Sequence, residues 1–509
     1  MRKHGHVNSS LLFCYILLLL PVATLRAEIN VAPNGRSFTA ARLPQEHAYQ
    51  VSLRNYLKSL KAEDLHIENT TWESKVPAAN IDADTLFRNS LARNGKGSEL
   101  DALRVPAKLF TLSEIEKAGK VRCFFRPEVA AWWIHCGLPG NPFHASEPAK
   151  RRAFVMAAVN LMLVDAYWHS GESFRRADGL SGNVFAWTAG YLASRDVLPE
   201  HARKAFETGL WRVAKAMLRA SPQDVNGNMD TKELIVLANL DKIFGGARHK
   251  IIIREARRIL FGRPGRGPAN SDGVMGLFHS AGYIGEKDGP ETTYNGIALF
   301  HLVEAALITR GRPDWDDFMP DVIERMLKFQ GHCTFPEPDG NVVGPSNWAK
   351  RTNQRYADQR TRSFRLHASA MLSDWGLFVS PELPPVEELA KLVVRQRAWR
   401  TGPPRKGPRE DFGFYWPADL NYAYEYYAKG HYKRMRRLQE EKNPLLRHPF
   451  LRKDNINECF DSEFWSVKQG RWGFLVESVA SLGIGYDFSN GERVGALAGG
   501  SLSAFWTKD

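Results

Sequence analysis

A long series of segments with helical periodicity is the feature that most constrains the fold of this chain. Between about Asp84 and Gln396, stretches with this period alternate with loops rich in Gly, Pro and Asn. The pattern predicts helices over residues 149–169, 201–220, 231–244, 250–260, 294–310, 316–330, 355–377 and 386–399. Consecutive helices joined by loops predict a mainly α fold made of helical hairpins.

Two arrangements of such hairpins are compatible with this pattern: a closed helical toroid and an open superhelical repeat array. The sequence has no self-similarity at a fixed period, which disfavours the common repeat arrays. Large aromatics lie on or near the loops: Trp132, Trp133, Trp168, Trp187, Trp211, Trp315 and Trp348. We therefore expect an (α/α) toroid, a closed double ring of helices whose loops on one side line a groove.

The composition changes after the basic, proline-containing stretch at residues 400–409. From Phe412 on, short aromatic and β-branched runs predict an antiparallel β region that is short or truncated. The expected organisation is an N-terminal extension at 28–83, a toroid domain at 84–399, a linker at 400–411 and the β domain at 412–509.

The first 27 residues have the pattern of a cleaved secretory signal peptide. Basic residues precede an apolar run from Leu11 to Leu20, and Pro21 and small residues follow. No later segment has the roughly 20 apolar residues that a transmembrane helix needs. We therefore expect a secreted or periplasmic protein without a membrane span.

The chain is basic, with a formal net charge of +13. In an exported protein this surplus favours an acidic polysaccharide as partner, although it can also serve solubility alone. Lys and Arg are scattered and no nucleic-acid-binding module is recognisable, so we expect no nucleic acid partner.

The sequence has neither the cysteine pattern of a disulfide framework nor the ligand spacing of a structural metal site. Beyond the signal segment the cysteines are Cys123, Cys136, Cys333 and Cys459, too few for a disulfide scaffold, and a pairing of the first two stays open. No CxxC or HExxH spacing is present, so we expect no metal and no cofactor, with a calcium or zinc site on scattered His and Asp residues as the alternative.

Residues 270–304 join a Gly-rich polar loop to the start of an apolar helix, and this loop has the composition of a functional site. It leads into an apolar helix at Tyr294 and Asn295. Loops with many ionisable groups around several glycines suit a site better than a core. The ionisable residues of this loop and of the helix start are His279, Tyr283, Glu286, Lys287, Asp288, Glu291 and Tyr294.

This loop resembles the corresponding segment of polysaccharide lyases of the alginate lyase and heparinase II/III type. The matching residues are DG at 272–273, EK at 286–287 and TTYNG at 292–296. The order of a helical region, a linker and an antiparallel β region is similar as well. The resemblance implies that Tyr294 is the catalytic base and acid and that Lys287 is a substrate-binding cation.

The same resemblance implies further site residues. Asn228 matches an asparagine that binds the uronate carboxylate, but Met229 stands where the alginate lyase type often has a histidine. A catalytic imidazole would then come from another position, and His279 is our first candidate. The expected substrate-binding residues are Lys287, Arg351, Glu291, Asn295, His301 and His332.

The implied reaction is a β-elimination on a uronate. A base removes the proton beside the carboxylate, an enolate forms, and the glycosidic oxygen leaves. Neutralising the carboxylate with Asn228 and with Lys287 or Arg351 lowers the barrier to the enolate. A phenol has a reference pKa near 10, so Tyr294 needs nearby cations to act as a base.

Each candidate also has a structural interpretation. Tyr294 can pack at a helix start, Asn228 can serve in a turn or cap, and His301 can be a half-buried histidine. Two other functions stay open. A glycoside hydrolase would use paired carboxylates, and a non-catalytic carbohydrate-binding protein would need only aromatics and a basic groove. The candidate carboxylates are Glu286, Asp288, Glu291, Asp272 and Asp230.

Overall fold

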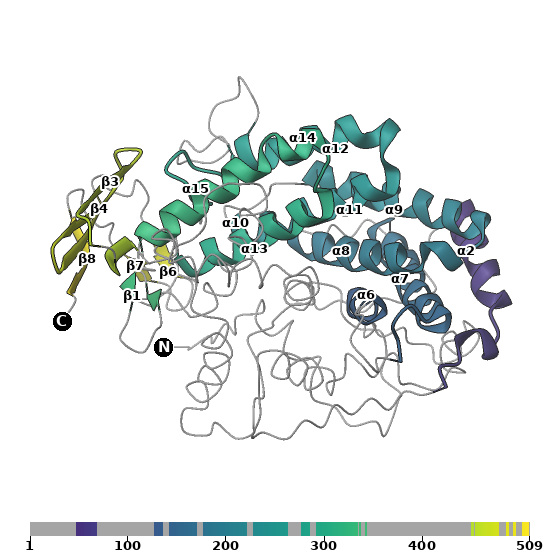
Figure 1. Ribbon diagram of the computed structural model, residues 1–509. Helices are drawn as coiled ribbons and strands as arrows, with labels where there is room; N and C mark the ends of the chain where they lie inside the picture. The colour runs from purple at the N-terminus through teal and green to yellow at the C-terminus, as the bar shows by residue number, and fades with distance from the viewer. Residues whose placement is uncertain are drawn as a thin grey trace, which may run out of the picture. The chain divides into compact units, whose positions relative to one another are not determined.

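The described part of the computed structural model is mostly helical, with a four-stranded antiparallel sheet within residues 456–507 and two small strand pairs (Figure 1). The chain divides into two compact units, one of residues 1–74, 91–175 and 186–216, the other of residues 75–90, 176–185 and 217–509. The structure describes residues 47–68, 127–135, 142–169, 177–220, 227–262, 276–285, 292–333, 335–336, 342–343, 449–451, 453–477, 485–487, 492–494 and 501–507.

The helices of the first unit pack around aromatic side chains. Phe154 of α7 contacts the rings of Tyr191 and Phe206 from α8 and α9. A buried carboxylate, Asp165, accepts a hydrogen bond from the Tyr49 hydroxyl and pairs with the Arg212 guanidinium. The elements of this unit are α2 (Ala48–Ser59), η3 (Glu63–Leu65), α6 (Pro127–His135), α7 (Glu147–His169), part of α8 (Ala177–Ser194), η6 (Arg195–Val197) and most of α9 (Glu200–Ala220).

The second unit is built around α13, which is apolar on nearly all sides. This helix lies against α11 and α15, and most of its described apolar side chains are buried, while Leu307 and Ile308 near its end are partly exposed. A helix that is apolar all round is stable only when neighbours cover it, as they do here. The helices of this unit are α10 (Gly227–Asp230), α11 (Lys232–Phe244), α12 (Gly246–Phe261), α13 (Thr292–Thr309), α14 (Pro313–Asp316) and α15 (Met319–His332).

The main sheet has the strand order β3-β4-β5-β8, and all its neighbours are antiparallel. Its inner face packs on α15 and on the loop before α13 through Phe460, Phe464 and Leu475, which meet Tyr283 and Phe329. The strands are β3 (Ile456–Phe460), β4 (Phe464–Gln469), β5 (Trp472–Glu477) and β8 (Ser501–Thr507), and two further pairs are β1 (Phe335–Pro336) with β2 (Val342–Val343) and β6 (Gly485–Asp487) with β7 (Glu492–Val494). A short 3-10 helix, η8 (Pro449–Leu451), precedes the sheet.

The structure confirms the mainly helical fold and the antiparallel sheet that the sequence predicts. Six predicted helices correspond to α7, α9, α11, α12, α13 and α15 with shifts of a few residues. The helices expected at 355–377 and 386–399, the linker and the signal segment lie outside the described residues. The closed ring of hairpins stays a prediction. Among the helices that the structure describes, none is both long and apolar enough to cross a bilayer.

Helix α8 was not predicted, because glycines interrupt its apolar pattern. The reason for one of them lies in packing. A Cβ at Gly190 would come within 2.6 Å of the Pro127 Cβ and 3.2 Å of the Ala153 carbonyl oxygen. Glycine therefore lets α8 approach α6 and α7 closely, and this contact outweighs its low helix propensity.

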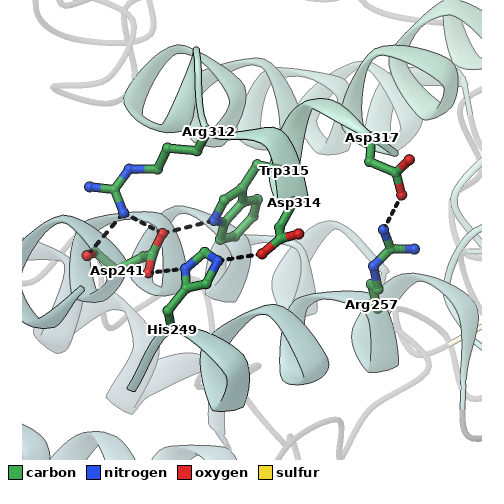
Figure 2. A network of polar contacts seen from close by, with 7 residues as sticks. All are labelled: Asp241, His249, Arg257, Arg312, Asp314, Trp315 and Asp317. Carbon is green, nitrogen blue, oxygen red and sulfur yellow. Dashed lines mark hydrogen bonds and ion pairs between the residues drawn. The ribbon is translucent and has the colours of Figure 1, made fainter. Parts of the chain in front are cut away.

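A buried carboxylate joins three helices of the second unit (Figure 2). Asp241, which is fully buried near the end of α11, accepts hydrogen bonds from Arg312 at 2.6 Å and from the Trp315 indole at 3.0 Å. Its other oxygen lies 2.7 Å from Nδ1 of His249 on α12, and Nε2 of that ring lies 2.7 Å from Asp314. Two carboxylates on one imidazole favour the doubly protonated ring, and these hydrogen bonds raise the pKa of His249.

Two consecutive glycines make this network possible. Gly245 and Gly246 both have positive φ, at 37° and 33°, and form the sharp corner between α11 and α12. Glycine adopts such values without the steric cost that other residues pay. The corner brings the first turn of α12 back against the end of α11, and this places His249 beside Asp241.

We expect His249→Ala to lower the free energy of unfolding by about 1–3 kcal/mol at pH 6, because a charged hydrogen bond to a buried carboxylate is lost. The pKa of His249 is higher in the folded than in the unfolded protein. Its stabilising contribution is therefore full below pH about 6.5 and falls as the pH rises through the folded-state value. Urea unfolding of both proteins from pH 5 to 9 measures this. A difference that stays constant or grows with pH contradicts the charged pairing.

Candidate functional site

The polar loop before α13 contains a small hairpin over residues 276–285. The Gly285 N–H donates to the Leu277 carbonyl, and the His279 N–H donates to the Tyr283 carbonyl, both at 2.8 Å. Gly282, with φ of 95°, turns the chain at the tip, where a Cβ would meet the Arg325 carbonyl oxygen at 2.7 Å. The two rungs lie about 7 Å apart along the hairpin, since each strand residue advances the chain by about 3.3 Å.

The first arm of this hairpin is fixed to the end of α12. The N–H groups of Leu277 and Phe278 donate to the carbonyls of Ile259 and Leu260 at 3.0 and 2.9 Å. The last carbonyls of a helix have no partner within the helix, so the loop satisfies two of them. These two hydrogen bonds fix the first arm of the hairpin to the last turn of α12.

The second arm meets both helix starts that carry the main candidates. The Gly227 N–H donates to the Gly285 carbonyl at 3.1 Å, and this ties α10 to the hairpin. The buried Asn295 side chain accepts the Ile284 N–H at 3.0 Å and donates to Gln330 of α15 at 2.8 Å. Segments far apart in the sequence thus converge at one point.

Gly227 is required for this close approach. A Cβ at this position would lie 2.3 Å from the Ile284 Cγ2 and 2.4 Å from the Gly285 carbonyl oxygen. Both distances are far below van der Waals contact, and one of the contacted atoms belongs to the backbone. A larger residue would push α10 away from the hairpin.

The two residues expected to do most of the chemistry occupy the ends that meet here. Asn228 is the second residue of α10, next to Gly227, and Tyr294 is the third residue of α13, next to Asn295. The structure describes their backbones and not their side chains. Lys287, Glu291 and Arg351 lie outside the described residues, as do the carboxylates Asp272, Glu286 and Asp288.

His301 lies two turns after Tyr294 on the same face of α13, since seven residues complete almost two turns. Its Nδ1 is 3.0 Å from the Thr231 hydroxyl, next to the end of α10, and the side chain is buried. Burial, aided by Lys232, holds the pKa of His301 well below its usual range. His301 is therefore a neutral contact between α13 and the α10–α11 corner.

His279 lies at the other end of the hairpin and faces the main sheet. Its ring stacks on Tyr283 with centroids 4.6 Å apart, and its Nδ1 accepts the Ala281 N–H at 3.2 Å. Its Nε2 lies 3.4 Å from Oε1 of Glu463, while the Tyr283 hydroxyl donates to Oε2 at 3.2 Å. Both ring nitrogens of His279 are thus engaged in contacts within the protein.

Glu463 is a residue that the sequence interpretation missed. It follows Asp461 and Ser462, whose φ values of 51° and 62° are unusual for residues other than glycine. Burial raises the pKa of the Glu463 carboxyl, Asp461 adds to the increase, and His279 and Tyr283 oppose it. The two consecutive left-handed residues mark a turn whose conformation is held by its surroundings, here by contacts of Asp461 and Glu463 with Ser280, His279 and Tyr283.

His332, the last candidate, ends α15 beside the sheet. Its ring centroid lies 5.7 Å from that of Phe460, and its carbonyl accepts the Ser466 hydroxyl at 2.8 Å. Cys333 next to it is a buried free thiol, and Cys459 is a free, exposed one. Within the part of the chain that the structure describes, no three His, Cys, Asp or Glu side chains gather as a metal site would require.

The comparisons with known proteins found no protein-family model and no curated protein that matches this sequence.

We expect Asn295→Leu to lower the free energy of unfolding by about 2 kcal/mol or more, because the Ile284 N–H and the Gln330 side chain lose a buried hydrogen-bond partner. Hydrogen exchange should show the Ile284 amide losing its protection while amides in the middle of α7 keep theirs. A double-mutant cycle with Gln330→Leu measures the coupling, which should be about 0.5–3 kcal/mol. Unchanged exchange at Ile284 would rule out the pinning role of Asn295.

Proposed function

We propose that this protein is an exported polysaccharide lyase that cleaves a uronate-containing acidic polysaccharide by β-elimination. In this proposal its helical hairpins form an (α/α) toroid, and Tyr294 and Asn228 act at the groove side of that toroid. The proposal joins the resemblance in the loop at 270–304 with the packing of the segments that carry the candidate residues.

One observation carries the proposal. Asn228 and Tyr294 each stand beside a residue that hydrogen-bonds to the same arm of one hairpin, through Gly227 to Gly285 and through Asn295 to Ile284. In an elimination, the group that binds the carboxylate and the base both act on the same sugar unit. The backbone segments that carry these two groups must therefore lie close together in space. The loop that joins them continues into Lys287, whose cation would favour the charged enolate.

Tyr294 takes the proton beside the uronate carboxylate and returns a proton to the leaving glycosidic oxygen. Asn228 and Lys287, with Arg351 from the later loop, bind the carboxylate and stabilise the charge that moves onto it. Lys287 also lowers the cost of ionising the Tyr294 phenol. Glu291 lies within the same loop and contacts the hydroxyls of the sugar.

The histidines and Asn295 support this chemistry from within the protein. Asn295 and His301 are buried and hydrogen-bonded to neighbouring segments, so we assign them the positioning of α13 relative to α10. His279 holds the hairpin tip to the sheet through Glu463, and His332 lies at the same contact with the sheet. These residues would then affect substrate binding through the shape of the loop.

The competing hydrolase would use two of the carboxylates around the loop. Asp230, one of its candidates, is 2% exposed at the end of α10. A buried carboxylate of this kind is poorly suited to contact a polymer. A carbohydrate-binding protein without catalysis is the other alternative, and it differs from both by giving no turnover.

The test is ultraviolet absorbance during incubation with a panel of acidic polysaccharides. Elimination creates a C=C bond conjugated to the carboxylate, and absorbance should rise with at least one polymer. Tyr294→Phe should reduce the rate by about 100-fold or more, because general acid–base catalysis contributes about 10²–10⁴. Asn228→Ala should reduce it by about 10²–10³ through loss of charge stabilisation.

Tyr56→Phe is the matched control, since Tyr56 is buried among the helices of the first unit and packs on Phe154. It should keep the full rate. New reducing ends without absorbance would instead support the hydrolase. If Tyr294→Phe and Tyr56→Phe behave alike, Tyr294 is not the catalytic base.

A further inference from the structure

The main sheet has one face that carries exposed aromatic rings. Trp465, Trp472 and Phe505 are 41%, 40% and 52% exposed. The register places them on the same face, because residues paired directly across antiparallel strands point to the same side. Trp472 stacks on Phe505 at 5.3 Å between centroids, and Phe505 also contacts Phe474 at 5.5 Å. The other exposed large apolar side chains of the described residues are scattered on α2 and α12: Val51, Ile251 and Phe261.

The opposite face of the sheet is the one that builds the core. Phe460, Phe464 and Leu475 are buried against α15 and the hairpin, and along β4 buried side chains alternate with partly or fully exposed ones. The aromatic rings therefore do not serve the packing of the sheet on the helices. Contiguous exposed aromatics on a folded domain commonly mark a binding surface.

The polar residues of the outer face are amides and a hydroxyl. Asn457 pairs with Val467, Gln469 pairs with Trp472, and Trp472 pairs with Thr507, so all three polar side chains share the aromatic side. No described residue at an outward position of these strands is charged. The cation of Arg471, in the turn between β4 and β5, lies 5.0 Å from the centroid of the Trp472 ring.

We propose that this outer face, defined by Trp465, Trp472, Phe505 and Arg471, binds a stretch of acidic polysaccharide outside the catalytic groove. Aromatic rings stack on the C–H faces of sugar rings, amides and hydroxyls bond to sugar hydroxyls, and the guanidinium pairs with a uronate carboxylate or sulfate. The described outward positions of these strands carry no carboxylate that would repel an anionic polymer. The acidic class of ligand rests on the proposed function, whereas the sugar-binding role of the face does not.

A second copy of this chain is a less suitable occupant. Protein interfaces have a core of tightly packed apolar residues with few unsatisfied polar groups. Here Asn457, Gln469 and Thr507 alternate with the rings, and in a protein–protein contact their polar groups would need partners. On a polysaccharide these groups meet hydroxyls at every sugar unit.

Affinity electrophoresis tests the proposal. The mature protein is run in native gels that contain alginate, hyaluronan or neutral hydroxyethyl cellulose. Trp472→Ala and Phe505→Ala should each lower the apparent affinity for an acidic polymer about tenfold, because stacking on one ring contributes about tenfold to affinity. Arg471→Gln should weaken binding to the acidic polymers and leave any binding to the neutral one unchanged.

Ile251→Ala is the matched control, because it removes an exposed apolar side chain of α12 that is distant in sequence from the sheet. It should keep native retardation. Tyr294→Phe should also keep it, so that loss of catalysis and loss of this surface are distinguishable. Circular dichroism melting identifies any variant that fails to fold.

Cys459 provides a local readout that needs no mutation. This exposed thiol pairs with Trp465 in the register, so it lies on the proposed binding face. Bound alginate or hyaluronan should slow its alkylation by a maleimide several-fold, as peptide mapping by mass spectrometry measures. Full reactivity of Cys459 at saturating polymer, or unchanged retardation of Trp472→Ala and Phe505→Ala, overturns the proposal. A concentration-dependent dimer that these variants abolish, without polymer binding, assigns the face to a second copy instead.

Discussion

The side-chain amide of Asn295 is the contact on which the arrangement of the candidate site depends. It accepts from the hairpin at Ile284 and donates to Gln330 of α15, while it belongs to α13 itself. One buried amide therefore sets the positions of three segments. A buried amide has few geometries that satisfy both of its ends, so the hairpin cannot slide along α13 without an energetic cost. Gly227 then brings α10 against the same hairpin, and the starts of α10 and α13 become neighbours.

Buried polar groups play the same role elsewhere in the second unit. Asp241 joins α11, α12 and α14 through Arg312, Trp315 and His249, and Glu463 joins the sheet to the hairpin tip. Apolar packing around α13 supplies most of the stability, but it is tolerant of small shifts. Directional contacts from charged and amide groups select one register for each helix. Apolar packing thus stabilises the unit, while the directional polar contacts fix the positions of its loops.

The helical part of the fold was largely predictable from the sequence. Apolar positions recur at helical spacing along α9, α12 and α15, and the apolar segments of α7 and α13 are too long for strands. Helix α8 was not predicted because glycines interrupt its apolar pattern, whereas β3 lies within the predicted β region although Asn457 and Glu458 have low strand propensity. The convergence of α10, the hairpin and α13 was not predictable in detail, because Asn295 has partners from distant segments. The contact of Glu463 with His279 was not predictable from the sequence either, since only the tertiary fold brings the turn after β3 against His279.

The central claim is that the chain breaks a glycosidic bond without adding water, and the oxygen balance of the products tests it most directly. The protein would be incubated with a uronate polymer in water labelled with heavy oxygen, and the products analysed by mass spectrometry. The account predicts unsaturated fragments, lighter by one water than hydrolysis products, with no label incorporated at the cleaved bond. Saturated fragments that carry the heavy oxygen at the new reducing end would contradict it and transfer the chemistry from Tyr294 to a pair of carboxylates.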